Sequence, residues 1–488
     1  MYDDVSIFDI PHVVSSIGSY LDCRDRASCI LVNKTFCDLF KPILWRELVI
    51  DQRPSLSMNE DIEPHLKQIL TRNCQSTRSL TIRRSNNDGA LAFIPTSCNR
   101  LKDLTVQLIS DDDNSIVALI TNNKDLREFS FYAYTHPTCA DLEALPDALA
   151  RSATLTVLRL ELRWRPGRGW LKHILQNLPR NLTSVTLQWG QERVGDLKWR
   201  FSAQDWPHIY PSLEVADLSF ESLTGDEVVL GQFLKRCPAL RSFSSPTMAE
   251  AQIQPLIPLL GSSNLPNLTS VYLGKFGKTN EIQWRDLVMI LKGRIRHFAA
   301  SFEYPLTNIA SMLSRNWSDT LESLRFLWIS RIFSRDVQLI LTTCSKLKQF
   351  DCMWTLADDG SQEDDDKELD MKAWTCSGLE ELHLMFADNR RSLTKLKVLT
   401  IGWHTKQDFS ENSNLDMTLQ SGLGHMANLK ALKTLDINFL PQVNIGLSEV
   451  QWIAENWPAL RLISGLRPEP ELDHITWLCS KRPKLVIY

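Results

Sequence analysis

One spacing of apolar residues recurs along most of the chain from about residue 75: an apolar residue, two others, an apolar residue, one other and a third apolar residue. Clear copies are Leu101-Leu104-Val106, Leu155-Leu158-Leu160, Leu321-Leu324-Phe326 and Leu432-Leu435-Ile437. Because the last two apolar positions alternate with other residues, each copy predicts a short strand with one buried face. Successive copies mostly lie 24 to 32 residues apart, which leaves room for a helix between strands.

The segments between the strands carry helix signals. Thr224-Gly225-Asp226-Glu227 and Ser448-Glu449-Val450-Gln451 match the capping box, which predicts that helices begin there. One strand and one helix cannot bury their own apolar faces, so neighbouring units are expected to stack into a solenoid. The predicted fold class is α/β, with a curved parallel sheet inside and helices outside. The repeat resembles the leucine-rich repeat, and Cys237 and Trp457, which come just before strands, resemble its cysteine-containing form.

Two places interrupt the repeat. The step from Leu382 to Leu399 is only 17 residues, and the next step, to Leu435, is 36. We expect the strand around Leu399 to be kept, with the preceding segment ADNRRSLTK as a tight connection. Residues 357–370 are rich in acidic side chains, which predicts a disordered insertion. The alternative is that this insertion attracts a basic partner.

The first 48 residues follow a different pattern, which predicts three short amphipathic helices. Pro11 suits a first helical position, where its missing N–H is not needed. Val14, Ile17 and Leu21 then recur at helical spacing and form an apolar stripe. About forty residues bury too small a core to be stable alone, so this segment is expected to lean on a neighbour.

The order of landmarks in this segment resembles the F-box: Ile10-Pro11, Tyr20-Leu21-Asp22, Leu31-Val32-Asn33 and Leu44-Trp45. The resemblance implies a module that docks on a Skp-family adaptor and, through it, on a cullin-RING complex. The chain departs from the family pattern where Ile10 replaces the usual Leu and His12-Val13-Val14 replaces Glu-Leu-Leu. By resemblance, the adaptor-binding residues are Ile10, Pro11, Ile17, Leu21, Leu31, Val32, Leu44 and Trp45.

These likenesses divide the chain into an F-box at 1–48, a connector at 49–74 and a leucine-rich-repeat solenoid at 75–488. Together they imply the substrate-recognition subunit of an SCF-type E3 ubiquitin ligase, a non-catalytic adaptor whose repeats bind a protein substrate. A second interpretation keeps the fold without ubiquitin, as an interaction scaffold whose N-terminal helices only cap the solenoid. A third is a regulator that wraps an enzyme and changes its activity.

Residues that alternate with the buried strand positions face outward and are candidates for substrate contact. We expect substrate binding by Tyr132, Arg159, Tyr272, Arg325, Asp351, Met353, His383 and Met385. The alternative for each is an ordinary solvated strand residue. A column of rings beyond the strand pattern shares the parity of the buried leucines, which predicts core rather than a binding groove. Its members are Trp189, Phe220, Phe302, Trp328, Trp354, Phe386, Trp403 and Phe439.

Composition narrows the function classes further. The net charge of −4 argues against a nucleic-acid surface, and no apolar run reaches membrane-spanning length. The acidic start of the chain lacks a signal-peptide pattern, so we expect a cytoplasmic or nuclear location. The eleven cysteines form no Cys-x-x-Cys pair, and neither a phosphate-binding glycine loop nor a His-Glu-x-x-His motif occurs. We therefore expect no disulfide, metal or cofactor.

Overall fold

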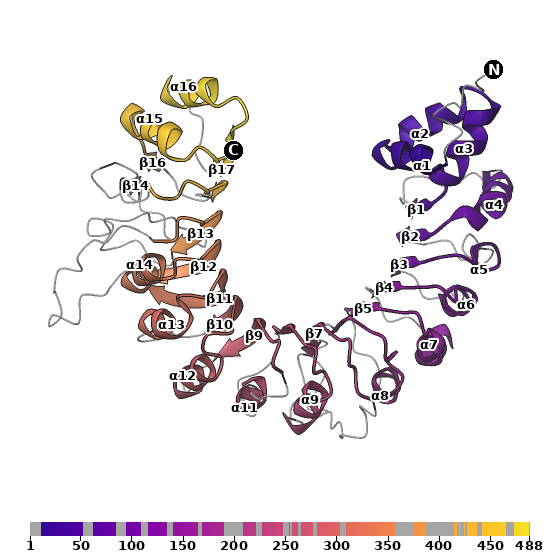
Figure 1. Ribbon diagram of the computed structural model, residues 1–488, viewed down its shortest axis with the longest axis horizontal. Coiled ribbons are helices and arrows are strands. Elements are labelled where there is room, and N and C mark those ends of the chain that lie inside the picture. The colour runs from indigo at the N-terminus through magenta and orange to yellow at the C-terminus, as the bar shows by residue number, and fades with distance from the viewer. Residues whose placement is uncertain are drawn as a thin grey trace, which may run out of the picture. The chain divides into compact units, whose positions relative to one another are not determined.

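The computed structural model describes most of the chain in two compact units, Met1–Leu240 and Arg241–Tyr488. The described residues are 11–51, 62–83, 94–108, 116–133, 140–163, 168–189, 208–220, 227–246, 253, 256–261, 265–276, 281–302, 309–356, 375–386, 414–416, 419, 424, 427–436, 442–464 and 473–487. Each unit contains a parallel sheet with helices along one side of it (Figure 1).

The first unit begins with three helices, α1 (Pro11–Tyr20), α2 (Cys23–Ile30) and α3 (Lys34–Leu44). Its parallel strands pair in chain order: β1 (Glu47–Asp51), β2 (Ser79–Arg83), β3 (Asp103–Leu108), β4 (Glu128–Ala133), β5 (Val157–Leu162), β6 (Ser184–Trp189) and β7 (Val215–Phe220). The helices that connect or follow these strands are α4 (Ile62–Asn73), α5 (Ile94–Ser97), α6 (Ile116–Asn122), α7 (Ala140–Arg151), α8 (Arg168–Gln176) and α9 (Glu227–Leu234).

The second unit repeats the arrangement. Its parallel strands are β8 (Ser242–Ser245), β9 (Ser270–Phe276), β10 (His297–Phe302), β11 (Ser323–Phe333), β12 (Gln349–Leu356), β13 (Glu381–Phe386), β15 (Thr434–Asp436), β17 (Leu462–Ser464) and β18 (Val486–Ile487). The helices are α11 (Ile257–Leu260), α12 (Glu281–Ile290), α13 (Ile309–Trp317), α14 (Ser334–Thr343), α15 (Leu447–Asn456) and α16 (Asp473–Lys481). A separate pair of strands is formed by β14 (Asn414–Asp416) and β16 (Gln442–Asn444).

The apolar positions of the repeat lie in register from strand to strand. Leu104 of β3 lies opposite Phe129 of β4, which lies opposite Leu158 of β5, and all three are buried. Helices supply the other side of this core, as Leu119 of α6 and Leu149 of α7 are also buried. The predicted α/β fold, with a parallel sheet and helices outside it, is therefore confirmed as a solenoid-like stack of strand–helix units.

The prediction that a strand around Leu399 is kept in the sheet is wrong. Strand β13 pairs directly with β15, with Leu382 opposite Leu435. A 17-residue step is too short for a return helix, so the leucine spacing there matches the strand pattern without a repeat to support it. Residues 387–413, like the predicted insertion at 357–370, lie outside the described residues.

The sheet begins before the segment in which the repeat was expected. Strand β1 pairs with β2, with Leu48 opposite Leu80, so residues 49–74 contain part of a strand and the helix α4. The predicted start of α15 also differs, because Gly446 rather than Ser448 is the N-cap residue. There the Glu449 carboxylate accepts a hydrogen bond from the Gly446 N–H (3.1 Å). The predicted N-cap of α9, Thr224, lies outside the described residues.

Candidate functional site

Capping side chains fix the starts of α2 and α3. The Asp22 carboxylate accepts a hydrogen bond from the Asp25 N–H (2.8 Å), and Asn33 Oδ1 accepts one from the Phe36 N–H (2.9 Å). Each bond satisfies a donor that the first helical turn leaves unpaired. The two caps therefore determine which residues fall between the helices, and several candidate adaptor-binding residues fall there.

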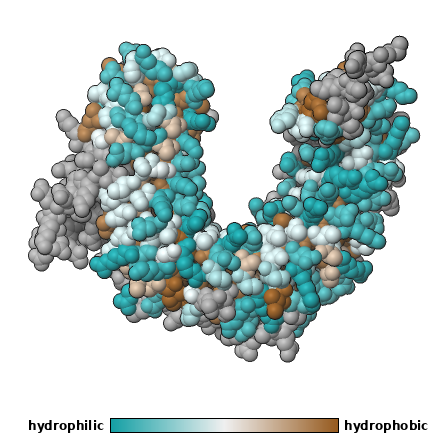
Figure 2. All heavy atoms as spheres, viewed as in Figure 1, coloured by the Kyte–Doolittle hydropathy of each residue, from teal (hydrophilic) through white to brown (hydrophobic). Residues whose placement is uncertain are grey.

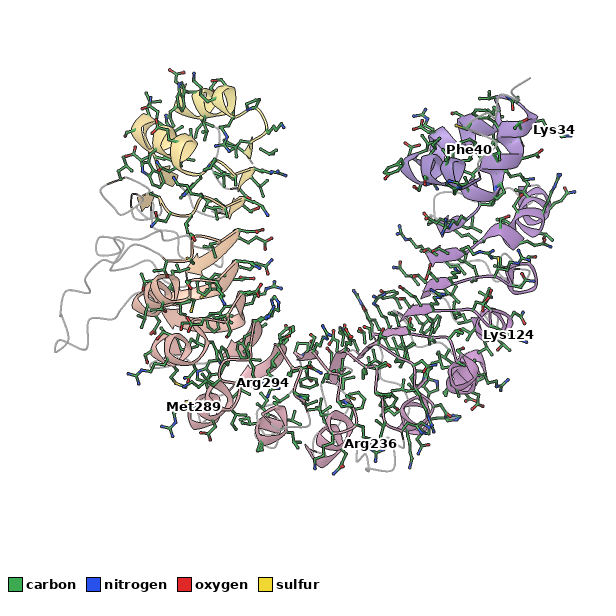
Figure 3. All side chains as sticks on the ribbon, viewed as in Figure 1. Lys34, Phe40, Lys124, Arg236, Met289 and Arg294 are labelled. Atoms are coloured by element: carbon green, nitrogen blue, oxygen red, sulfur yellow. The ribbon has the colours of Figure 1, made fainter. Side chains whose placement is uncertain are left out.

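The core of this three-helix segment is small. Phe40 of α3 is buried and stacks on Phe36, with 5.6 Å between ring centroids, and Val14 of α1 is buried beside them in the segment. Figure 3 shows Phe40 among the N-terminal helices. Helices α1 and α3 approach closely at Gly18, where an added Cβ would lie 2.8 Å from Ile43 Cδ1. This packing joins the helices but encloses few of their apolar side chains.

Apolar side chains remain exposed at both ends of α2. Tyr20, before the helix, is 90% exposed, whereas Leu31 and Val32, after it, are 85% and 63% exposed. No residue of α2 itself is buried. Figure 2 shows hydrophobic atoms at the surface of this N-terminal region. Large exposed apolar groups gathered on so small a segment are typical of a surface that binds another protein.

The predicted adaptor-binding residues fall into two described classes. Leu31 and Val32 are exposed and available for contact, whereas the side chains that are half-buried are Ile17, Leu21, Leu44 and Trp45. Pro11 is the first residue of α1, but its side chain is not described, and Ile10 lies outside the described residues. The sequence pattern did not single out Tyr20 as a contact residue, although its exposure exceeds that of every predicted one.

The outward face of β4 and β5 brings Tyr132 and Arg159 near each other. Tyr132 lies opposite Glu161, and Arg159 lies opposite Ser130. Arg159 Nη1 lies 3.4 Å from Ser130 Oγ and 4.0 Å from a Glu128 carboxylate oxygen. Both predicted residues are half-buried, so each presents only part of its side chain to a partner.

A polar network that the sequence did not reveal continues across β5 to β7. Gln188 Nε2 donates to Asp217 Oδ2 (2.9 Å), and the Ser219 hydroxyl lies 3.3 Å from Asp217 Oδ1. Burial raises the pKa of Glu161, and the nearby charge of Asp217 raises it further. Strand register was needed to find this group, because its members lie far apart in the sequence. The face can donate and accept hydrogen bonds along a protein ligand.

In the second unit, Arg325 and Asp351 form an ion pair across β11 and β12, with 3.3 Å between Nη2 and Oδ2. His383 lies opposite Asp351 on β13, and Tyr272 on β9 is half-buried. The side chains of Met353, His383 and Met385 are not described. The strand register therefore places Arg325, Asp351 and His383 in one row, whereas Tyr272 lies two strands away from Arg325.

The predicted aromatic column stays a prediction. Its members on the described strands have side chains that are not described, and Trp403 and Phe439 lie outside the described residues.

The cysteines of the repeat are buried thiols. Cys237, Cys344 and Cys352 are each 0% exposed. Burial raises the pKa of Cys237 and raises that of Cys344 to about 11, so both thiols are protonated at neutral pH. Such thiols are poor nucleophiles and pack as small apolar groups. Within the described ranges, no group of three or more His, Cys, Asp or Glu residues could hold a metal ion.

No protein-family model matches the chain, and no curated protein matches its sequence. Among the described residues, no helix has both the length and the apolar character needed to cross a bilayer. The functional argument therefore depends on the exposed apolar groups around α2 and on the outward faces of the two sheets.

Proposed function

We propose that the chain is the substrate-recognition subunit of an SCF-type E3 ubiquitin ligase. In this proposal α1 to α3 are an F-box that docks on a Skp-family adaptor, and the strand–helix units are leucine-rich repeats that bind a protein substrate. The chain does no chemistry itself. It holds the substrate in the same assembly as the ubiquitin-charged enzyme, which raises the effective concentration of the substrate lysines.

The observation that carries the proposal is the exposed apolar surface at the ends of α2. Leu31 and Val32 belong to the stretch that resembles the F-box, and they stay exposed after the three helices have packed. Full burial of an aliphatic side chain of this size against a partner contributes about 1.5–3 kcal/mol. A helical segment that served only to cap the sheet would have no need to leave these side chains in water.

One observation favours the alternative, a non-ligase interaction scaffold with an N-terminal helical cap. The α3 helix leads into β1 after one turn, and the Arg46 carbonyl accepts hydrogen bonds from the N–H groups of Arg78 (2.8 Å) and Ser79 (3.0 Å). The three helices are thus continuous with the first strand of the sheet, as a cap would be. The two functions differ in whether the exposed groups bind an adaptor.

Binding of the full-length chain to a purified Skp-family adaptor tests the proposal. We expect the L31E/V32E double variant to bind at least about tenfold more weakly than the unaltered chain, because it places two charges in an apolar contact. A matched control is I209E, since Ile209 is 65% exposed in the same unit but lies far along the chain from the helices. I209E should bind like the unaltered chain.

Circular dichroism melting of all three proteins separates lost contact from lost folding. Absence of adaptor binding by the unaltered, folded chain at micromolar concentration would overturn the ligase proposal and leave the scaffold alternative. Equal weakening by I209E and L31E/V32E would show that the groups around α2 are not the docking site.

A further inference from the structure

One residue position just before each strand forms an aligned row in both sheets. In the first unit the row begins with Arg46, Arg78, Lys102 and Arg127, which precede β1, β2, β3 and β4. The main chain holds these four side by side, because Arg78, Lys102 and Arg127 each donate a backbone N–H to the carbonyl of the preceding member (2.8, 2.6 and 2.7 Å). We call these four residues the basic ladder.

The equivalent row in the second unit shows what side chains at this position do. Arg296, Glu322 and Lys348 precede β10, β11 and β12, and their charges alternate. Glu322 accepts from Lys348 Nζ at 2.6 Å and lies 3.6 Å from Arg296 Nη1. Further along the row, Lys433 pairs with Glu380. Neighbouring side chains at this position therefore reach each other, and alternating charge makes the row self-satisfying.

The basic ladder lacks this alternation. Arg46, Lys102 and Arg127 are exposed and Arg78 is half-buried. Within the described part of the chain, none of the four forms an ion pair; Arg78 donates only to the carbonyl of Arg100 (3.1 Å). Like charges on adjacent strands destabilise a sheet. A row that could have alternated, as the other unit's does, instead carries an unneutralised cost that a bound anion would remove.

We propose that the basic ladder binds an acidic segment of the protein substrate, in extended conformation. This inference rests on the proposed function and names the chemistry of its substrate. Adjacent strands lie about 4.8 Å apart, so four members span about 14 Å, which corresponds to about four residues of an extended chain. Two or three carboxylates on such a segment could each meet a guanidinium or ammonium group.

The surroundings of the ladder favour a narrow polypeptide over a nucleic acid. The next residue along the chain is acidic in three of the four repeats: Glu47, Asp103 and Glu128. Glu128 lies 4.0 Å from Arg159, on the side away from the ladder position. An acidic row beside the basic one repels a broad polyanion, and the net charge of −4 does the same at longer range. A thin acidic peptide avoids this repulsion.

Fluorescence anisotropy on the full-length chain tests the inference with a labelled peptide of consecutive glutamates as the probe. A glutamine peptide of the same length and a single-stranded oligonucleotide are the comparison probes. We expect K102E/R127E to weaken binding of the glutamate peptide by about tenfold or more, since two attractions become repulsions. The matched charge reversal is R151E/K235E, because Arg151 and Lys235 are exposed cations of the same unit outside the ladder. It should bind like the unaltered chain.

Two further readouts keep the result separate from the ligase proposal. K102E/R127E should bind the Skp-family adaptor normally, and L31E/V32E should bind the glutamate peptide normally. Absence of glutamate-peptide binding at about 50 mM salt, where screening is weak, would overturn the ladder and leave the adaptor result unaffected. Equal loss with R151E/K235E would reduce the effect to net charge and also overturn it. Tighter ladder-dependent binding of the oligonucleotide would overturn the acidic peptide as the occupant.

Discussion

Asn123, at the end of α6, does more for the stack than any neighbouring polar residue. It is 1% exposed, its Oδ1 accepts from the Leu101 N–H (2.6 Å), and its Nδ2 donates to the carbonyls of Cys98 (2.9 Å) and Leu119 (2.7 Å). One side chain thus links two successive repeats. We expect Asn123→Ala to lower the free energy of unfolding by about 1–3 kcal/mol, because it leaves buried backbone groups unpaired.

Urea denaturation of the full-length chain measures this change. Lys124→Ala is the control, since Lys124 is exposed and lies at the helical side of the sheet (Figure 3). A variant Asn123→Ala as stable as Lys124→Ala would mean that water replaces the lost hydrogen bonds.

Glu322 makes stability depend on pH. The hydrogen bond from Lys348 lowers the pKa of Glu322 most, and the charges of Lys348, Arg296 and His297 lower it further, against the opposing effect of burial. Its pKa in the folded chain thus lies below its ordinary value of 4.5. The stabilisation is therefore present above that value and is lost as the pH falls through the folded-state pKa.

We expect the melting temperature to fall between about pH 5 and pH 3 and Lys348→Met to reduce the Glu322 contribution to that fall. Lys346→Met removes a neighbouring exposed lysine that has no ion pair among the described residues, and it should leave the pH profile unchanged. Identical profiles for the two variants would contradict the assignment of this effect to Lys348.

At the scale of elements, Arg482 ties the last helix to the repeat before it. After α16 its guanidinium donates to the carbonyls of Trp457 (3.1 Å), Pro458 (2.7 Å) and Leu460 (2.9 Å), which lie between α15 and β17. A lysine keeps the charge but lacks the planar fork that reaches several acceptors at once. We expect Arg482→Lys to destabilise this junction by about 1–2 kcal/mol.

Hydrogen exchange followed by mass spectrometry checks this locally. Peptides from α15, β17 and α16 should exchange faster in Arg482→Lys, whereas peptides from β9 to β12 should not change. Lys484→Ala, a change at an exposed neighbour, should leave all of them unchanged. Uniformly faster exchange over the whole unit would point to global rather than local loss of stability.

The elements that could be predicted from the sequence are those whose own side chains carry the burial. Strand β3 hides Leu104 and Val106 completely, so its spacing alone predicts it. Strand β1 could not be found in this way, because Leu48 and Ile50 at the sheet's end are only half-buried and Val49 between them is 56% exposed. The false strand around Leu399 shows the opposite case, a local spacing without a neighbour to pair with.

The candidate surfaces divide in the same way. The F-box resemblance named Leu31 and Val32 because contiguous landmarks carry it, but whether a side chain is exposed depends on packing, and Tyr20 was missed. The basic ladder depends on register between residues about 25 to 32 positions apart. It could have been found by aligning the residue before each predicted strand, but only after β1 and β2 were known.

For the whole molecule, the two proposed surfaces of the first unit predict separable losses in cells. The groups around α2 should determine whether the chain joins a ligase, and the basic ladder should determine which proteins it brings there. A full-length chain fused to a proximity-labelling enzyme should therefore label both the adaptor and a set of proteins with acidic segments. L31E/V32E should lose the adaptor but keep that set, and K102E/R127E should lose the set but keep the adaptor.

The abundance of the labelled proteins then separates a ligase subunit from a scaffold. If the chain delivers substrates for ubiquitination, these proteins should accumulate with L31E/V32E, because binding without the adaptor leaves them unmodified. They should accumulate with K102E/R127E as well, since they are no longer bound, and should stay at their normal level with I209E. A scaffold predicts no change in abundance with any variant, even where labelling is lost. Quantitative proteomics of the four cell lines distinguishes these outcomes, since labelling reports contact and abundance reports its consequence.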